Sequence, residues 1–174
     1  EVTGVESAQQ LHDAMLGLAA SADIVVMCAA VADFRPVDRS DVKLKRRDGL
    51  PNIELEPTPN VLRALVGERR ADQVVVGFAA ETDHLGQNAR EKLEGSGADM
   101  IVANDVSRPD AGFEHPTNAV TILRAGGLDP VDVPLADKRT IADRLLDLAL
   151  EQRSVARGDS GGSIHTPQRL RTVN

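Results

Sequence analysis

The sequence predicts an α/β protein built on a doubly wound, mostly parallel sheet, and three apolar runs carry this prediction. The runs begin at Ile24, Val74 and Asp99, and each has the length of roughly five or six residues that is typical of strands buried on both faces. Segments with helical spacing separate the runs, and strands that alternate with helices form parallel sheets. A chain of 174 residues, 41% of them hydrophobic, holds one such core.

The first helix and strand are expected before residue 30. Ser7 to Gln10 has the form of a capping box, and apolar residues follow it from Leu11 at helical spacing. The strand from Ile24 then ends in a loop of small residues that contains Asp33. Because ligands of doubly wound sheets bind at the carboxyl ends of strands, residues 29–35 form the first candidate site. A solvated loop without a ligand is the alternative.

A two-residue alternation follows this loop. Val42 and Leu44 alternate with Lys43 and Lys45, and a second alternating run covers residues 53–56 beyond a turn at 48–49. This pattern predicts a hairpin or mobile flap. The four cations between residues 43 and 47 would then lie on a lid that closes over a polyphosphate, or on an ordinary solvated face.

The rest of the chain resumes the alternation of helix and strand. Thr58 and Pro59 predict the start of a short helix, and Gly77 in the second apolar run predicts a close approach of backbone or ligand. After the third run we expect a hairpin around residues 126–127 and a last helix capped by Asp137. We therefore expect one domain over residues 1–152 and a disordered tail over residues 153–174.

The overall composition excludes several classes of function. Lys and Arg number 20 against 27 Asp and Glu, and this net charge of -7 argues against binding to nucleic acid or to a membrane surface. Cys28 is the only cysteine, which excludes an internal disulfide and a multi-cysteine metal site and favours a cytoplasmic location. No apolar stretch approaches the roughly 20 residues that span a bilayer. The chain starts at Glu1 without methionine, so we expect it to be part of a longer chain.

The three phenylalanines predict a crevice with aromatic walls. Phe34, Phe78 and Phe113 all follow expected strands, and runs of small residues accompany the first two. Neither the dinucleotide fingerprint G-x-G-x-x-G nor a Walker A motif occurs. A phosphate would therefore have to meet the cations of residues 43–47.

Six motifs, taken in order, resemble those of the bacterial phosphopantothenate–cysteine ligases, the synthetase half of the bifunctional coenzyme A biosynthesis flavoprotein. The resemblance covers about residues 1–150. The motifs are AAVADFRP (29–36), K-x-K-R (43–46), GFAAET (77–82), K-L (92–93), ANDV (103–106) and NAVTIL (118–123). The family implies a Rossmann-like fold and a dimer. It also implies an amino-terminal part of the fold, with a Gly-rich strand and turn, that this chain lacks.

The resemblance also implies which residues bind the nucleotide, CTP. Asp33 would hold ribose or Mg²⁺, Lys43 would pair with the triphosphate and act in catalysis, and Phe78 would form a wall for the base. Ser96 stands where the family has a second lysine, and neither Asn104 nor Asn118 matches the family's asparagine for the acyl-cytidylate. The full predicted set is Met27, Cys28, Ala29, Asp33, Lys43, Pro59, Asn60, Val61, Leu62, Phe78, Lys92 and Ser96.

The activity that the resemblance implies is the ligation of 4'-phosphopantothenate with L-cysteine through an acyl-cytidylate. CTP would be the co-substrate and Mg²⁺ the metal, with FMN confined to a fused decarboxylase that this chain does not contain. Two alternatives stay open at this point. One is a nucleotide-binding module without chemistry, and the other is an NAD(P)-dependent enzyme whose glycine fingerprint lies upstream.

Overall fold

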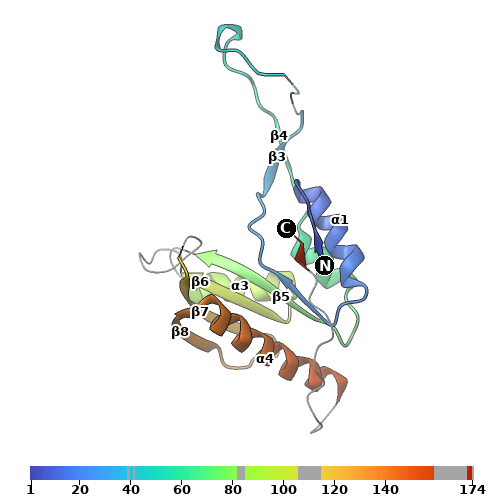
Figure 1. Cartoon of the computed structure of the whole chain (residues 1–174), viewed down its shortest axis with the longest axis vertical. Coiled ribbons are helices and arrows are strands. Elements are labelled where there is room, and N and C mark those ends of the chain that lie inside the picture. The colour runs from blue at the N-terminus through green and yellow to red at the C-terminus, as the bar shows by residue number, and fades with distance from the viewer. Residues whose placement is uncertain (39, 41, 82–84, 106–114, 159–171, 174) are drawn as a thin grey trace.

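A computed structural model describes residues 1–38, 40, 42–81, 85–105, 115–158 and 172–173. Its central sheet has five strands in the order β2-β5-β6-β7-β8 (Figure 1). The first three run parallel, and β7 and β8 form an antiparallel hairpin at one edge. The strands are β2 (Ile24–Met27), β5 (Val74–Glu81), β6 (Met100–Asp105), β7 (Thr117–Arg124) and β8 (Val131–Asp137). The predicted α/β class, the mostly parallel sheet and the carboxyl-terminal hairpin are confirmed.

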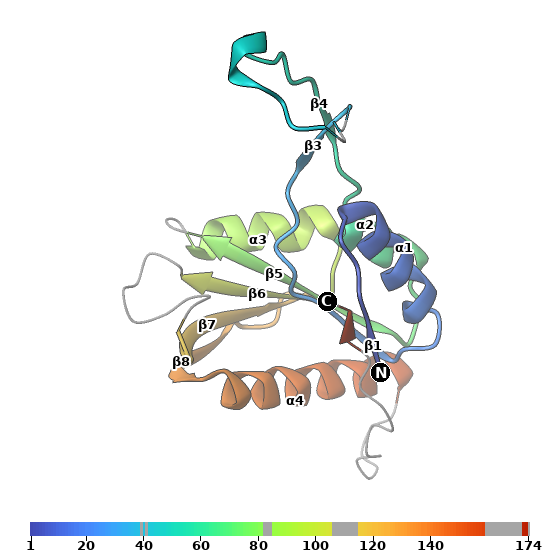
Figure 2. The same ribbon diagram turned by 45° about the horizontal axis from the view of Figure 1, so that its top comes forward.

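Helices cover both faces of this sheet, as Figure 2 shows. The helices α1 (Ala8–Ala19), α2 (Val61–Glu68) and α3 (Leu85–Ser96) pack on one face, and α4 (Lys138–Arg157) packs on the other. Alternate residues of β5 divide between the two cores: Val75 contacts the first group of helices, and Val76 belongs to the cluster with α4. The strand runs are apolar throughout because both faces are buried.

Two of the predicted helix starts are formed by side-chain caps, whereas the start predicted at Thr58 and Pro59 is wrong, because Asn60 caps α2 and the helix begins at Val61. The hydroxyl of Ser7 accepts a hydrogen bond from the Gln10 amide at 3.2 Å. Asp137 accepts one from the Thr140 amide at 2.9 Å and another from the Thr140 hydroxyl at 2.7 Å. These bonds from Thr140, the hydroxyl first, lower the pKa of Asp137.

The expected flap is an arm that projects from the body of the molecule (Figure 1). Among the described residues of the arm, strand pairing is confined to the base, where β3 (Phe34–Pro36) lies antiparallel to β4 (Leu55–Pro57). The predicted strand at residues 42–45 is wrong, and the short helical turn η1 (Arg46–Asp48) follows it instead. Val42 and Leu44 are 74% and 59% exposed, so the apolar side of the alternation has no core to pack against in the single chain. A two-stranded ribbon without such a core is marginal, which explains why pairing stops near the base.

The carboxyl end differs from the expected disordered tail. α4 continues to Arg157, five residues into the segment that was expected to be a disordered tail. The reason is tertiary: the Arg153 guanidinium contacts the Asp23 carboxylate at 2.6 Å and the Asp72 carbonyl at 3.3 Å. Further on, β9 (Thr172–Val173) pairs with β1 (Val2–Thr3), while residues 159–171 lie outside the described residues. Within the described parts of the chain, no helix is long and apolar enough to cross a membrane.

Candidate functional site

A cleft of about 760 Å³ opens at the carboxyl edge of the parallel strands. Its walls come from the ends of β2, β5 and β6, the first turn of α2 and the carboxyl half of α3. Every residue of the predicted nucleotide site except Lys43 lies in the lining. The lining residues are Met27, Cys28, Ala29, Ala30, Val31, Asp33, Phe34, Pro57, Thr58, Pro59, Asn60, Val61, Leu62, Arg63, Phe78, Ala79, Ala80, Lys92, Gly95, Ser96 and Asn104.

Asp33 is held at the mouth of this cleft by the backbone around it. The Thr58 amide donates to the Asp33 carbonyl at 2.9 Å, and the Thr58 hydroxyl donates to the Ala32 carbonyl. These bonds fasten the loop after β2 to the segment that leads into α2. The carboxylate of Asp33 is exposed, so it is available to a ligand in the cleft.

The first turn of α2 offers backbone donors to the cleft. The Asn60 side chain caps the helix and accepts from the Arg63 amide at 3.0 Å. The amides of Val61 and Leu62 in the same turn have no partner inside the helix, because helix geometry supplies none there. Such a turn is suited to an anion, since its donors and the helix dipole both favour negative charge.

Gly77 brings α2 close to the sheet, as its presence in the strand predicted. A Cβ atom at Gly77 would lie 2.6 Å from Cδ2 of Leu62 and 2.8 Å from Cδ1 of Ile101. Both distances are shorter than van der Waals contact, so a side chain at residue 77 would force Leu62 and Ile101 to move. The position of the α2 turn in the cleft therefore depends on this residue.

Phe78 and Lys92 form a connected wall. The Lys92 ammonium donates to the Phe78 carbonyl at 2.8 Å, which fixes the cation at the end of β5. Phe78 is half-buried, and Phe34, which also lines the cleft, is 61% exposed. Both therefore contribute to the predicted aromatic crevice, whereas Phe113 lies outside the described residues.

Asn104 is a residue of the cleft that the sequence analysis did not assign to the site. It is only 7% exposed, and its Oδ1 atom, as the amide is oriented, has no hydrogen-bond partner among the described residues. An unsatisfied buried polar atom costs about 1–3 kcal/mol, and such atoms are rare in folded proteins. The available signal was a polar residue directly after a buried strand, which is the same signal that singled out Asp33.

Two predicted residues are placed differently from the rest. Lys43 lies on the arm, exposed and outside the cleft lining that the described residues form. Ser96 lies in the lining, but its hydroxyl is used by the backbone: it donates to the Leu93 carbonyl at 3.4 Å and accepts from the Ala98 amide at 3.3 Å. Most of the predicted residues thus lie together in the cleft, whereas Lys43, which was predicted to pair with the triphosphate, lies on the arm.

The predicted Mg²⁺ would need oxygen ligands from the residues of the cleft. No group of three or more His, Cys, Asp or Glu side chains suited to a metal occurs among the described residues. Asp33 supplies one exposed carboxylate at the cleft. Mg²⁺ commonly uses one or two carboxylates together with phosphate oxygens and water. The residues therefore fit Mg²⁺ when it arrives with a phosphate-bearing ligand.

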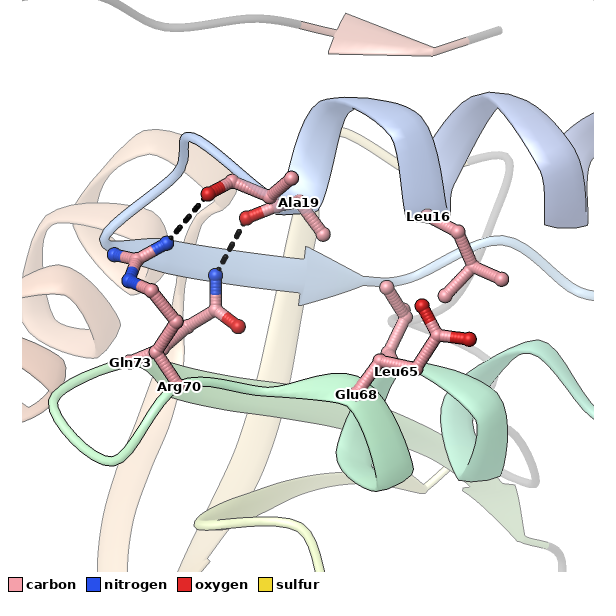
Figure 3. A pocket seen from close by; sticks show the side chains of 7 residues that line it. Leu16, Ala19, Leu65, Glu68, Arg70 and Gln73 are labelled. Carbon is pink, nitrogen blue, oxygen red and sulfur yellow. Dashed lines mark hydrogen bonds between the residues drawn. The ribbon is translucent and has the colours of Figure 1, made fainter.

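A second, much smaller cavity of about 50 Å³ lies between α1 and α2 (Figure 3). Arg70 donates to the Ala20 carbonyl at 2.8 Å, and Gln73 donates to the Ala19 carbonyl at 2.7 Å. Because these polar groups already have partners and the space suits only one or two water molecules, we assign no site there.

Comparison with known proteins agrees with this geometry. The family model for the DNA/pantothenate metabolism flavoprotein C-terminal domain matches residues 1–152. The chain belongs to this family. The predicted relationship to the synthetase half of the bifunctional coenzyme A flavoprotein is thereby confirmed.

Curated relatives of this family member include the coenzyme A biosynthesis bifunctional protein CoaBC of Bacillus subtilis, which is 40% identical over 146 residues. The CoaBC protein of Mycobacterium tuberculosis H37Rv is 40% identical over 157 residues. Each alignment covers 84% of this chain but only 36% and 37% of the two relatives, respectively. The chain thus spans just over a third of their length.

Among solved structures, the C-terminal domain of a CoaBC protein superposes with a TM-score of 0.67 at 30% identity. The match covers 91% of this chain and 74% of that domain. The DNA/pantothenate metabolism flavoprotein from Streptococcus pneumoniae superposes with a TM-score of 0.63 at 21% identity, covering 83% and 69% of the two chains. At that identity the second structure supports the fold alone.

Proposed function

We propose that the chain is the nucleotide-binding part of a ligase that joins 4'-phosphopantothenate to L-cysteine with CTP in coenzyme A biosynthesis. Family membership and the CoaBC relatives support this role. The observation that carries it is the cleft, where residues predicted from separate motifs meet at one edge of the sheet. The predicted residues in the lining are spread from Met27 to Ser96 along the chain, and a ligand bound in the cleft would contact all of these segments.

The proposed reaction has two steps. A carboxylate oxygen of 4'-phosphopantothenate attacks the α-phosphorus of CTP, the bond to the β-phosphate oxygen breaks, and pyrophosphate leaves. The cysteine amine then attacks the acyl carbon of the acyl-cytidylate. The bond to the CMP oxygen breaks, CMP leaves, and the nitrogen loses a proton as the amide forms.

The chain's own residues would bind and orient the nucleotide. The amides of Val61 and Leu62 would donate to phosphate oxygens, Lys92 would add positive charge at the end of β5, and Asp33 would hold the metal or a ribose hydroxyl. Bound Mg²⁺ would supply neutralising charge to the phosphates. Lys43 would reach the triphosphate only when the arm lies over the cleft, so its catalytic role stays a prediction.

Asn104 would contribute selectivity. Its unpaired Oδ1 is a hydrogen-bond acceptor two residues beyond Val102, which is the register partner of Phe78. The exocyclic amine of cytosine is a donor of the kind that this acceptor requires, whereas uracil carries an oxygen at the same position. A base that stacks on Phe78 and donates a hydrogen bond to Asn104 would give the Oδ1 atom the partner that it lacks.

A nucleotide-binding module without chemistry would use the same cleft, and it remains the second candidate because Lys43 lies outside the lining. The NAD(P)-dependent alternative is disfavoured, because residues 1–152 match the family of the DNA/pantothenate metabolism flavoprotein C-terminal domain. The expected homodimer, the fused FMN-dependent decarboxylase and the cytoplasmic location remain predictions that rest on the resemblance.

Calorimetric titration of the intact protein with CTP, ATP and UTP in Mg²⁺ tests the proposal. We expect CTP to bind tightest and UTP to bind at least about tenfold more weakly than CTP, because one hydrogen bond to a buried acceptor is lost. Asp33→Asn should weaken CTP binding without changing the melting temperature. Asp129→Asn, in the turn before β8 and outside the cleft, is the matched control. Equal binding of all three nucleotides, or none, would refute the proposal.

A further inference from the structure

Cys28 lies one residue past the end of β2, and its exposed thiol forms part of the cleft wall. The preceding residue, Met27, is buried in the core beneath α1 and α2. Successive side chains of an extended segment point to opposite faces, so Cys28 is directed to the face that α4 covers. Met27 is in register with Gly77, which places Cys28 beside Phe78 at the same level of the sheet.

The same face of the cleft carries an independent sign of a ligand. Phe78 packs against the core cluster of the α4 face and is in register with Val102 of β6. Asn104, two residues further along β6, therefore points to this face, and its Oδ1 is buried without a partner among the described residues. Because β5 lies between β2 and β6, a ligand that lies over Phe78 and reaches Asn104 also lies next to Cys28.

We propose that Cys28 is a thiol-modification site whose exposure is controlled by the cleft's ligand. A low-molecular-weight disulfide, such as oxidised glutathione, is the expected partner. The Cys28 sulfur attacks one sulfur of that disulfide, the original S–S bond breaks, and a new S–S bond forms to Cys28. The released thiol carries away the proton of Cys28. Cys28 is oxidised and half of the disulfide is reduced, so no other oxidant is needed.

The consequence is mutual exclusion at the proposed nucleotide site. An adduct on Cys28 fills the space beside Phe78 that the base would occupy, and a bound base blocks the approach of the disulfide. Because coupling between two binding events is reciprocal, each must weaken the other by the same factor at equilibrium. Oxidation of the thiol would thus switch off nucleotide binding, and a reducing thiol would restore it. The inference rests on the proposed function for the choice of CTP.

The first arm of the test measures labelling. The intact protein is treated with N-ethylmaleimide or oxidised glutathione, and modification of the Cys28 peptide is followed by mass spectrometry with and without CTP and Mg²⁺. At a CTP concentration ten times the dissociation constant, about a tenth of the sites stay free, so we expect the labelling rate to fall about tenfold. UTP at the same concentration, where it binds weakly, should protect little.

The second arm measures CTP binding by calorimetry before and after glutathionylation. We expect a loss of at least tenfold in affinity that dithiothreitol reverses. In Cys28→Ala, whatever its own affinity, oxidised glutathione must leave CTP binding unchanged. If the unmodified protein binds CTP but modification does not weaken binding, or CTP does not slow labelling, this inference is overturned and the proposed function stands. If the unmodified protein binds no CTP, the proposed function fails and the inference falls with it.

Discussion

Three polar side chains at the edge of the sheet differ in how their hydrogen-bonding groups are used. The Lys92 ammonium donates a hydrogen bond to the Phe78 carbonyl, and the Ser96 hydroxyl forms hydrogen bonds with the backbone at the end of its own helix. Asn104 leaves an acceptor unpaired inside the protein. The first two groups therefore stabilise the walls of the cleft. The unpaired acceptor lowers the stability of the ligand-free protein, and a ligand that donates a hydrogen bond to it would remove this penalty.

Replacing Asn104 should separate stability from binding. In Asn104→Leu the unsatisfied atom is lost and the side chain keeps its branching. We expect the free energy of unfolding of the ligand-free protein to rise by about 1 kcal/mol, while CTP affinity falls about tenfold. Denaturant unfolding and calorimetric titration measure the two quantities.

The matched control for this prediction is Asn118→Leu. Asn118 lies on β7 outside the cleft, and its side-chain oxygen accepts from the Ala119 amide at 2.9 Å. This variant should lose stability and keep its CTP affinity. A less stable Asn104→Leu protein with normal CTP binding would show instead that Asn104 serves the fold.

At the scale of elements, the cleft depends on how closely α2 lies against β5. Leu62 reaches over the bare backbone of Gly77, while the same residue belongs to the turn that faces the cleft. The contact between Leu62 of α2 and Gly77 of β5 therefore contributes both to the packing of the helix and to the shape of the cleft. The arm formed around β3 and β4 is the contrasting element, because its apolar residues have no such contact within the single chain.

Gly77→Ala should displace α2. The added Cβ would overlap Leu62 and Ile101, both of which are buried, and overpacking of this kind costs about 1–3 kcal/mol. We also expect weaker CTP binding, because the shift moves the amides of the first turn. Thermal unfolding and titration measure both effects.

Gly67→Ala provides the comparison within α2 itself. A Cβ atom at Gly67 meets nothing within 4 Å, so alanine should stabilise the helix by about 0.5–1 kcal/mol. Its CTP affinity should stay normal. If Gly77→Ala is as stable as the wild type, the close approach of α2 does not depend on the missing side chain.

At the scale of the whole molecule, α4 joins the hairpin edge of the sheet to the start of its parallel strands. Its apolar side packs on the sheet, and Arg153 near its end contacts Asp23 before β2 and Asp72 before β5. The Arg153 side chain is only 16% exposed, while Asp23 and Asp72 are 57% and 37% exposed. This cluster fastens the last turns of the helix to the opposite end of the sheet from the cleft.

Truncation tests where the folded unit ends. A chain that stops at Gln152 loses Arg153, and we expect it to lose about 1–2 kcal/mol, a value that allows for the exposure of the two carboxylates. For a protein of this size that corresponds to a fall in melting temperature of about 2–8 °C. A chain that stops at Gly158 retains the contacts and should melt above the shorter one. Equal melting temperatures would place the end of the folded unit at residue 152 after all.

The amino-acid sequence alone determined the fold class and most of the cleft. Buried strands are apolar on both faces, and parallel strands place their carboxyl ends at one edge, so Asp33 and Phe78 could be assigned to a common site from their positions after two such strands. Local side chains also form the helix caps, which explains why Ser7 and Asp137 were predicted correctly. Each of these features depends on neighbours that are close in the chain or on a general rule of sheet topology.

Three features depend on the tertiary structure and could not be predicted from the sequence. They are the conformation of the arm, the residue at which α4 ends and the unpaired acceptor of Asn104. The alternation from Val42 to Lys45 resembles a strand, but a strand needs a partner and a core, and the described part of the chain provides neither there. Arg153 stays helical because it contacts Asp72, 81 residues away in the chain. The Oδ1 atom of Asn104 lacks a hydrogen-bond partner because the surrounding packing buries it without placing a donor next to it. Such contacts between distant residues leave no periodic pattern in the sequence.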